Sequence, residues 1–243
     1  MIYTKVKSSS DIKLYQGDNA LYIDEISKIK NIVLITDPPF NINYHYNEYK
    51  DNLDEEDYWE WLDSLFNRFN KKVIIHYPEE QYKLSFQMGL FPEKVISWVY
   101  NSNLQRQHRS INFYGFKPNF NQVLQPYKNL DDKRIIERIN RGILGSKMYD
   151  WFYVDQVKNV NREKTSHPAQ MPVEVMKRII ATLPKDSIVF DPFMGSGTTG
   201  VACKELGYDF IGIELNKEYY EIAKERIKNT IVELDIFDFM EES

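Results

Sequence analysis

The chain has 243 residues, 42% hydrophobic and 28% charged, with a formal net charge of −5. These values are ordinary for one compact globular domain and exclude a fibrous or disordered chain. The single cysteine, Cys203, excludes an internal disulfide and a multi-thiolate metal site. Because no signal peptide and no run of roughly 18 apolar residues is found, we expect a cytoplasmic protein with no membrane contact and no metal.

Charge is distributed unevenly along the chain. Residues 41–65 contain eight acidic side chains and one lysine, whereas residues 101–150 contain nine basic side chains and four acidic ones. The basic stretch is suited to nucleic-acid phosphates, although a charged run is more often only a solvated surface.

Strand-like and helix-like runs alternate along most of the sequence, which predicts an α/β domain with layers of helices on a sheet. A short strand precedes Asp18, and residues 101–165 interrupt the alternation with a single clear helix at 132–142. We therefore expect an insert there with a separate role. The other predicted elements, in chain order, are strand 31–36, helix 55–69, strands 72–77 and 93–100, helix 172–183, strand 187–190, helix 198–207, strand 210–214 and helix 216–229.

The tetrapeptide Asp37-Pro38-Pro39-Phe40 directly follows the predicted strand 31–36. Ligands of parallel sheets bind at the carboxyl ends of strands, so this segment is placed to line a site. Asp37 and the Pro38 carbonyl can accept both N–H groups of a planar amino group while Phe40 stacks on the attached ring. Taken alone, such a tetrapeptide is more often only a rigid turn.

A glycine-containing loop, Asp191 to Thr199, joins a predicted strand to a helix, and the next strand ends at Glu214. This arrangement is typical of a nucleoside site, in which glycines allow close approach and the carboxylate accepts ribose hydroxyls. A P-loop is excluded because its lysine is absent. A dinucleotide is a rival ligand, but its pyrophosphate would meet Asp191, a like-charge contact. S-adenosylmethionine carries adenosine without phosphate and fits better.

The DPPF segment, the HPAQMP segment (167–172) and the DPFMGSGTT loop together resemble the DNA amino-methyltransferases in which the catalytic tetrapeptide precedes the cofactor loop. The resemblance implies a Rossmann-like methyltransferase fold with a mostly parallel seven-stranded sheet covered by helices on both faces. It divides the chain into a first catalytic part (1–100), a DNA-recognition insert (101–165) and a second catalytic part (166–243). It also implies S-adenosylmethionine as cofactor, double-stranded DNA as substrate, and a homodimer and a cognate restriction endonuclease as possible partners.

The same resemblance assigns roles residue by residue. The catalytic residues are Asp37, Pro38, Pro39 and Phe40, with Phe40 in the place of the commoner Tyr. Met171 stands where Lys is usual, which puts a charge at that place in question. The implied cofactor-binding residues, with Asp18 toward the adenine and Glu214 toward the ribose, are Asp18, His167, Gln170, Pro172, Asp191, Pro192, Phe193, Gly195, Ser196, Gly197, Thr198, Thr199, Glu214 and Asn216.

Asp at the first place of the tetrapeptide resembles the enzymes that methylate the adenine 6-amino group, whereas cytosine-N4 enzymes usually carry Ser there. A target base must leave the duplex to reach such a slot. The loop 41–46, which contains Tyr44, His45 and Tyr46, either closes over that base or is a surface loop. The basic residues implied to contact DNA are Arg106, Arg109, Lys117, Arg134, Arg138, Arg141 and Lys147.

Several alternatives stay open at this stage. Cytosine-N4 methylation is the nearest one, and methylation of protein or RNA is another because a planar amide fits the same slot. A nucleotide- or nicotinamide-dependent enzyme and a non-catalytic DNA-binding module belong to other classes. His167 precedes Pro168 and is equally interpreted as a structural residue at a helix start.

Overall fold

The computed structural model describes residues 1–41, 51–102, 105–158 and 163–232. The predicted aromatic loop at 41–46 lies, beyond residue 41, outside the described residues. Among the described residues, no helix has both the length and the apolar character needed to cross a membrane.

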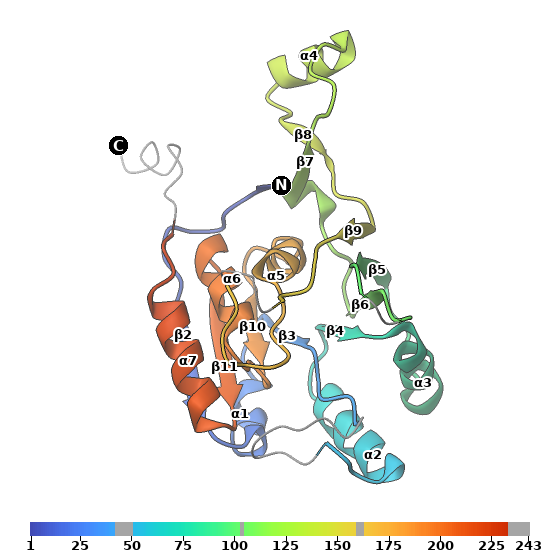
Figure 1. The fold of residues 1–243 in the computed structure, drawn as a ribbon, viewed down its shortest axis with the longest axis vertical. Coiled ribbons are helices and arrows are strands. Elements are labelled where there is room, and N and C mark those ends of the chain that lie inside the picture. Colours follow the sequence, from blue (N-terminus) through green and yellow to red (C-terminus); the bar gives the residue numbers. More distant parts are fainter. Residues whose placement is uncertain (42–50, 103–104, 159–162, 233–243) are drawn as a thin grey trace.

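An eight-stranded sheet forms the centre of the molecule (Figure 1). Every strand except β6 runs in the same direction, so most strands end at one edge of the sheet. All residues of β3 and β4 are buried, as expected for central strands with helices on both sides. In spatial order the strands are β2 (Ile12–Gln16), β11 (Asp209–Glu214), β10 (Ile188–Asp191), β3 (Ile32–Thr36), β4 (Lys72–His76), β6 (His108–Tyr114), β5 (Lys94–Val99) and β9 (Trp151–Tyr153).

Helices cover both faces of this sheet (Figure 1). Side chains of a strand alternate between faces, so Val33 and Ile35 pack on one side while Leu34 packs on the other. The first side carries α5 (Val173–Ile180), α6 (Thr198–Leu206) and α7 (Lys217–Lys228); the second carries α1 (Ile23–Ile26), α2 (Glu55–Phe66) and α3 (Pro78–Met88).

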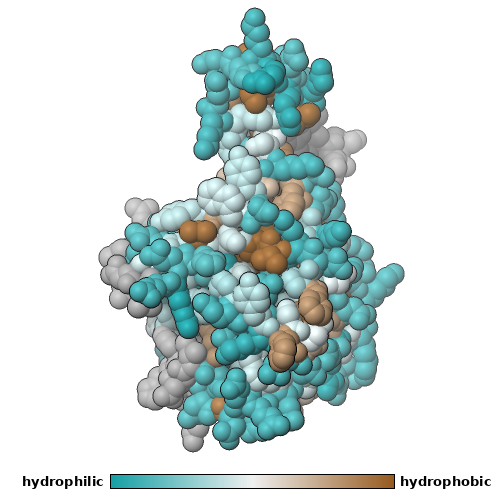
Figure 2. Space-filling model, turned by 90° about the vertical axis from the view of Figure 1, so that its right-hand side faces the viewer, coloured by the Kyte–Doolittle hydropathy of each residue, from teal (hydrophilic) through white to brown (hydrophobic). Residues whose placement is uncertain are grey.

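A small second sheet extends away from the body, with helix α4 (Lys133–Asn140) at its far end (Figures 1 and 2). Its strands are β1 (Ile2–Tyr3), β7 (Val123–Pro126) and β8 (Gly145–Lys147). We call residues 123–147 the arm. The side chain of Asp132 accepts a hydrogen bond from the Arg134 backbone N–H, which caps the first turn of α4.

The predicted Rossmann-like fold is confirmed, with two corrections. The sheet has eight strands and not seven, because the short strand β9 extends its edge. Residues 101–165 do not form one continuous insert, since β6 and β9 belong to the central sheet and the arm is the part that leaves it. Polar residues such as Asn112 are fully buried in β6 and hide the strand pattern from sequence reading.

Candidate active site

The aligned carboxyl ends of β2, β3, β10 and β11 open onto one cavity of about 350 Å³. Both sequence motifs line it, from Asp37 to Phe40 on one side and from Asp191 to Thr199 on the other. Topology explains the meeting, because β3 and β10 are neighbours in the sheet although about 150 residues of chain separate them. A group held by one motif can therefore react with a group held by the other.

Of the residues predicted to be catalytic or to bind the cofactor, all but two line this cavity. Pro172 is the residue before α5, and Gly197, at φ +78°, packs against Ala223 at the start of α6. Both shape the neighbouring backbone rather than the cavity wall. The predicted residues on the wall are Asp18, Asp37, Pro38, Pro39, Phe40, His167, Gln170, Asp191, Pro192, Phe193, Gly195, Ser196, Thr198, Thr199, Glu214 and Asn216.

Asp191 ends β10 at the floor of the cavity and is almost fully buried. One carboxylate oxygen accepts the backbone N–H of Phe193 at 3.0 Å, and the other accepts the hydroxyl of Thr199 at 2.5 Å. Burial outweighs these two hydrogen bonds and raises the pKa of Asp191 to about 7, and the nearby Asp37 and Glu214 act in the same direction.

Glu214 ends β11 and bridges the cofactor loop to the next helix. Its Oε2 accepts the N–H of Gly195 and its Oε1 accepts the N–H of Asn216, both at 2.9 Å. The Asn216 side chain in turn accepts the Tyr219 N–H at 3.0 Å and caps α7. The carboxylate is thus fixed at the cavity wall, where each oxygen retains a lone pair for a hydroxyl donor.

His167 packs directly on the glycine turn. Gly195 has φ +52°, and a Cβ there would come within 2.8 Å of the His167 ring nitrogen Nε2, so the close approach requires glycine. The His167 ring also contacts Tyr219 edge-on, with centroids 4.5 Å apart. Burial lowers the pKa of His167 to about 4, so the ring is neutral and forms a wall without charge.

Gln170 organises the segment that carries His167 rather than only lining the cavity. Its Oε1 accepts both the N–H and the hydroxyl of Thr165, and its Nε2 donates to the Glu163 carbonyl at 2.6 Å. Lys164 also donates to the His167 carbonyl. These contacts fix the conformation of residues 163–171, part of which lines the cavity.

Arg226 of α7 supports the cofactor loop, and sequence analysis did not identify it. Its Nη1 donates to the Ser196 carbonyl, the Ser196 hydroxyl and the Thr198 hydroxyl at 3.0 to 3.2 Å. No pattern in the helix sequence distinguishes this arginine from the exposed basic residues beside it. Its role is defined only by the packing of α7 on α6.

The tetrapeptide side of the cavity, which we call the base slot, contains an unexpected ion pair. Nη1 of Arg109, from β6, lies 2.6 Å from Oδ2 of Asp37. Burial raises the pKa of Asp37, and the positive charge of Arg109 opposes this shift. Arg109 was expected to contact DNA; in this structure its side chain is only 13% exposed and pairs with Asp37, so a contact with DNA stays a prediction.

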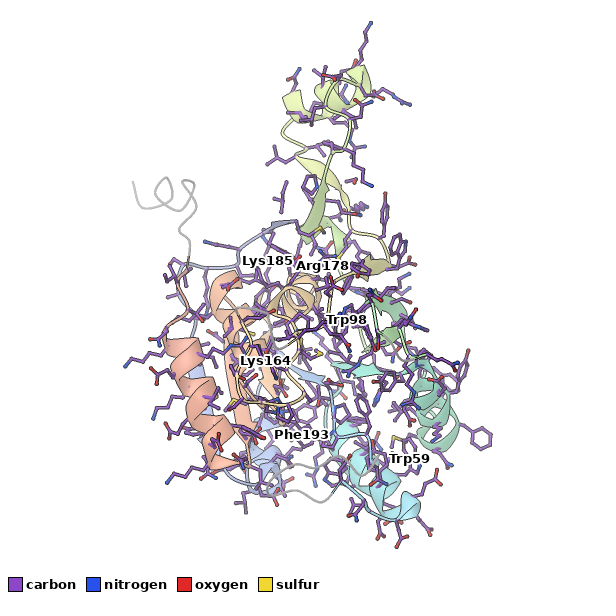
Figure 3. The ribbon with its side chains drawn as sticks, viewed as in Figure 1. Trp59, Trp98, Lys164, Arg178, Lys185 and Phe193 are labelled. Carbon is purple, nitrogen blue, oxygen red and sulfur yellow. The ribbon has the colours of Figure 1, made fainter. Side chains whose placement is uncertain are left out.

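Aromatic rings enclose the rest of the base slot. Phe40 contacts Tyr77 with ring centroids 5.4 Å apart and the neutral His76 at 5.9 Å. On the cofactor side, Trp61 of α2 contacts Phe193 at 5.5 Å. Figure 3 labels Phe193 and also Trp98 of β5, a buried ring whose centroid lies 5.6 Å from the guanidinium carbon of Arg109. Tyr77 and Trp61 line the cavity and were not predicted.

The other basic residues predicted to contact DNA are exposed. Arg134 pairs with Asp132 at 2.9 Å, which offsets its charge. Nε of Arg138 donates to the hydroxyl of Tyr127 at 2.7 Å, and this contact involves no carboxylate. Arg106 and Lys117 lie on the body, and the arm carries Arg134, Arg138, Arg141 and Lys147.

The cavity wall is rich in negative charge, with Asp18, Asp37, Asp191 and Glu214. Arg109 is the only lysine or arginine among the described residues that line it. Such a site favours a cationic ligand and disfavours a pyrophosphate, whose charges would meet carboxylates in a partly dry cavity. The charges of the cavity therefore argue against a dinucleotide as the ligand.

The sheet, its one antiparallel strand and the shared cavity define a Rossmann-like methyltransferase. Comparison with known proteins gives the family. The sequence pattern of the N6_N4_Mtase family, described as DNA methylase, matches residues 32–225, and the chain belongs to this family of DNA amino-methyltransferases.

Individual relatives agree with this assignment. The Type II methyltransferase M.HpaI of Haemophilus parainfluenzae is 30% identical over 241 residues, covering 88% of this chain and 75% of the relative. M.BglII of Bacillus subtilis is 26% identical, covering 87% and 67%. A crystal structure of an M1.HpyAVI–SAM complex is 27% identical with a TM-score of 0.60, covering 89% of this chain and 98% of that chain.

The PvuII DNA methyltransferase, which is cytosine-N4-specific, has a TM-score of 0.65 but only 15% identity, over 98% of this chain and 93% of that chain. At this identity the likeness shows the fold alone. The family thus fixes methyl transfer to an amino group of DNA without fixing which base carries it.

Proposed function

We propose that the protein transfers a methyl group from S-adenosylmethionine to the 6-amino group of adenine in double-stranded DNA. The observation that carries the proposal is the shared cavity, in which the Asp37 carboxylate faces the same space as the loop 191–199. The name of the M1.HpyAVI–SAM complex, a relative, supports the choice of cofactor. The Type II relatives support a role beside a restriction endonuclease.

The residues present fit this cofactor. Glu214 offers acceptors for ribose hydroxyls, Phe193 and Trp61 offer rings for the adenine, and Asp191 suits a positive charge. Gly195 lets the His167 ring pack on the loop backbone, and both residues form part of the cavity wall. S-adenosylmethionine supplies an electrophilic methyl group on a sulfonium when bound.

The base slot explains how the target nitrogen is activated. A base in a duplex cannot reach a buried cavity, so the nucleotide must rotate out and stack on Phe40. The amino lone pair is delocalised into the ring, and hydrogen bonds from both of its protons to Asp37 and the Pro38 carbonyl localise it. Asp37 then stabilises the positive charge that develops on the nitrogen during in-line transfer.

Adenine is proposed over cytosine because Asp37 stands at the first place of the tetrapeptide. To test this, the purified protein is incubated with DNA and cofactor labelled in its methyl group, and the DNA is digested to nucleosides. We expect the label in N6-methyl-2′-deoxyadenosine. Label in N4-methyl-2′-deoxycytidine would reverse the choice of base, and absence of label from every DNA tested would remove the proposed function itself.

A further inference from the structure

Arg109 already occupies the contacts that a target base would need. Its guanidinium donates to Asp37 at 2.6 Å, and its central carbon lies 5.3 Å from the centroid of the Phe40 ring. The Tyr77 and Trp98 rings lie at 5.2 and 5.6 Å from the same carbon. The guanidinium is planar, donates an N–H to Asp37 and lies over the Phe40 ring. A nucleobase with an exocyclic amino group would have the same features in this place.

The guanidinium and a target base are incompatible in this position. Both require the Asp37 carboxylate and the face of Phe40. In addition, the target nitrogen becomes positive as it accepts a methyl group, and a fixed guanidinium beside Asp37 would repel that charge in a partly dry slot. Catalysis is therefore fastest when Arg109 has moved away from Asp37.

We propose that Arg109 fills the base slot of the free enzyme and is exchanged for the target base when DNA binds. This inference rests on the proposed function and adds a positioning residue to it. In the free protein, Arg109 neutralises Asp37 and lies against the rings of Phe40, Tyr77 and Trp98. When the base enters, the base's amino group replaces the guanidinium as the donor to Asp37.

The position of Arg109 permits the exchange without movement of the sheet. It is the second residue of β6, and residues 105–108 just before it are exposed. A long arginine side chain can swing toward that surface by rotation about its own bonds. A DNA phosphate there would accept the displaced guanidinium, as phosphates do readily. Binding of DNA is then coupled to the separation of Arg109 from Asp37.

The test uses 2-aminopurine next to the target adenine, which keeps its 6-amino group, in a duplex with the sequence that the enzyme methylates. Fluorescence of 2-aminopurine rises when its stacked neighbour leaves the helix, so the signal at saturating protein reports the flipped fraction. Arg109→Met removes the charge while keeping a flexible stem of similar length. Because no exchange is then needed, we expect the flipped fraction to rise severalfold over that of the native protein.

Arg106→Met is the matched control. Arg106 also lies over the Tyr77 ring, at 4.7 Å, but is exposed and has no contact with Asp37 among the described residues. We expect its loss to weaken DNA binding and to leave the flipped fraction at saturation unchanged. An unchanged or lower flipped fraction for Arg109→Met would overturn the exchange.

A crystal structure of the native protein with target DNA provides a readout that does not depend on a variant. We expect the base against Phe40 and the Arg109 guanidinium beyond hydrogen-bond distance of Asp37. A bound base beside an intact Arg109–Asp37 pair would refute the exchange while leaving methyl transfer in place. A protein that neither flips nor methylates any duplex would instead refute the proposed function.

Discussion

Three carboxylates of the cavity, Asp37, Asp191 and Glu214, have different hydrogen-bond partners, and these partners determine how readily each one carries a negative charge. Glu214 is held by two backbone N–H groups, Asp37 by a guanidinium, and Asp191 by one N–H and one hydroxyl. Asp191 has no cationic partner among the described residues, and burial raises its pKa to about 7. Near neutral pH, its charge therefore depends on what binds beside it.

This pKa predicts a pH dependence of cofactor binding. Below about pH 7, Asp191 holds a proton in the free protein, and a cationic ligand must displace that proton to gain the attraction. Affinity for S-adenosylmethionine should therefore rise from pH 6 to pH 8, by up to about tenfold per pH unit below 7. Isothermal titration calorimetry at several pH values measures it, with proton release on binding as a second signature.

Asp191→Asn is the matched control because an amide oxygen still accepts the Phe193 N–H. Its cofactor affinity should be lower at pH 8 and nearly independent of pH. The folding stability of the native free protein should depend on pH in the opposite direction. Because the pKa of Asp191 is raised in the folded state, the ionised form is disfavoured there, and the free energy of unfolding falls as pH rises from about 4 to 7. An equal pH dependence in the native and Asn proteins would contradict this role for Asp191.

Sequence analysis placed the residues of contiguous motifs at a common site, and most of them line the cavity, but it missed side chains that come from other elements. Asp37 and Asp191 follow strands, so their place at the sheet edge is determined locally. Arg109 belonged to a basic stretch and was interpreted by its charge alone, whereas its partner lies 72 residues away. Tyr77 likewise enters the site through the pairing of strands, which one sequence does not reveal.

At the level of elements, helix α4 of the arm combines a basic surface with exposed apolar residues. Ile136 and Ile139 are 43% and 36% exposed, and Arg138 and Arg141 lie beside them. The helix is short and depends on its Asp132 cap and on β7 and β8 for its position. Its place outside the body fits the proposed role in DNA contact.

The charges of the arm predict the salt dependence of DNA binding. Replacing Arg138 and Arg141 together with alanine should weaken binding to all DNA sequences and reduce the slope of log affinity against log salt by about 2, roughly one for each lost phosphate contact. Fluorescence anisotropy at several salt concentrations gives this slope. Arg134→Ala is the control on the same helix, because its charge is already offset by Asp132. A slope that changes more for Arg134 than for the pair would argue against the arm as the phosphate contact.

Element prediction succeeded where hydrophobic periodicity was undisturbed. Helix 216–229 was predicted and α7 spans Lys217–Lys228, because apolar residues recur on one face and Asn216 caps the start. Strand β6 was missed because the buried polar residues Ser110 and Asn112 alternate with Ile111 and Phe113, so every one of these positions is buried. Helix α3 was missed because it leaves Tyr82 and Phe86 exposed and buries only Leu84.

For the whole molecule, the sheet joins two halves that are distant in sequence. The order β11-β10-β3-β4 places the cofactor loop beside the tetrapeptide, so one cavity has a cofactor part and a base part. Both motifs follow parallel strands and so lie at the same edge of the sheet, but only the strand order shows that β3 and β10 are neighbours. The arm could not be placed from sequence because its strands β1 and β8 pair with β7 across long separations.

The two parts of the cavity should be separable by a matched pair of carboxylate variants. Asp37→Ala removes the group that acts on the target nitrogen, so turnover should fall below detection while cofactor affinity changes little, since Asp37 lies in the base part. Glu214→Gln keeps one amide oxygen for a loop N–H but loses the charge and an acceptor, so cofactor affinity should fall about 10- to 100-fold. Calorimetry measures cofactor affinity, and single-turnover methylation at saturating cofactor measures the rate of the chemical step.

At saturating cofactor, Glu214→Gln should recover much of the native rate, and Asp37→Ala should recover none. Loss of cofactor affinity in Asp37→Ala comparable to that in Glu214→Gln would show that the cavity is not divided in this way.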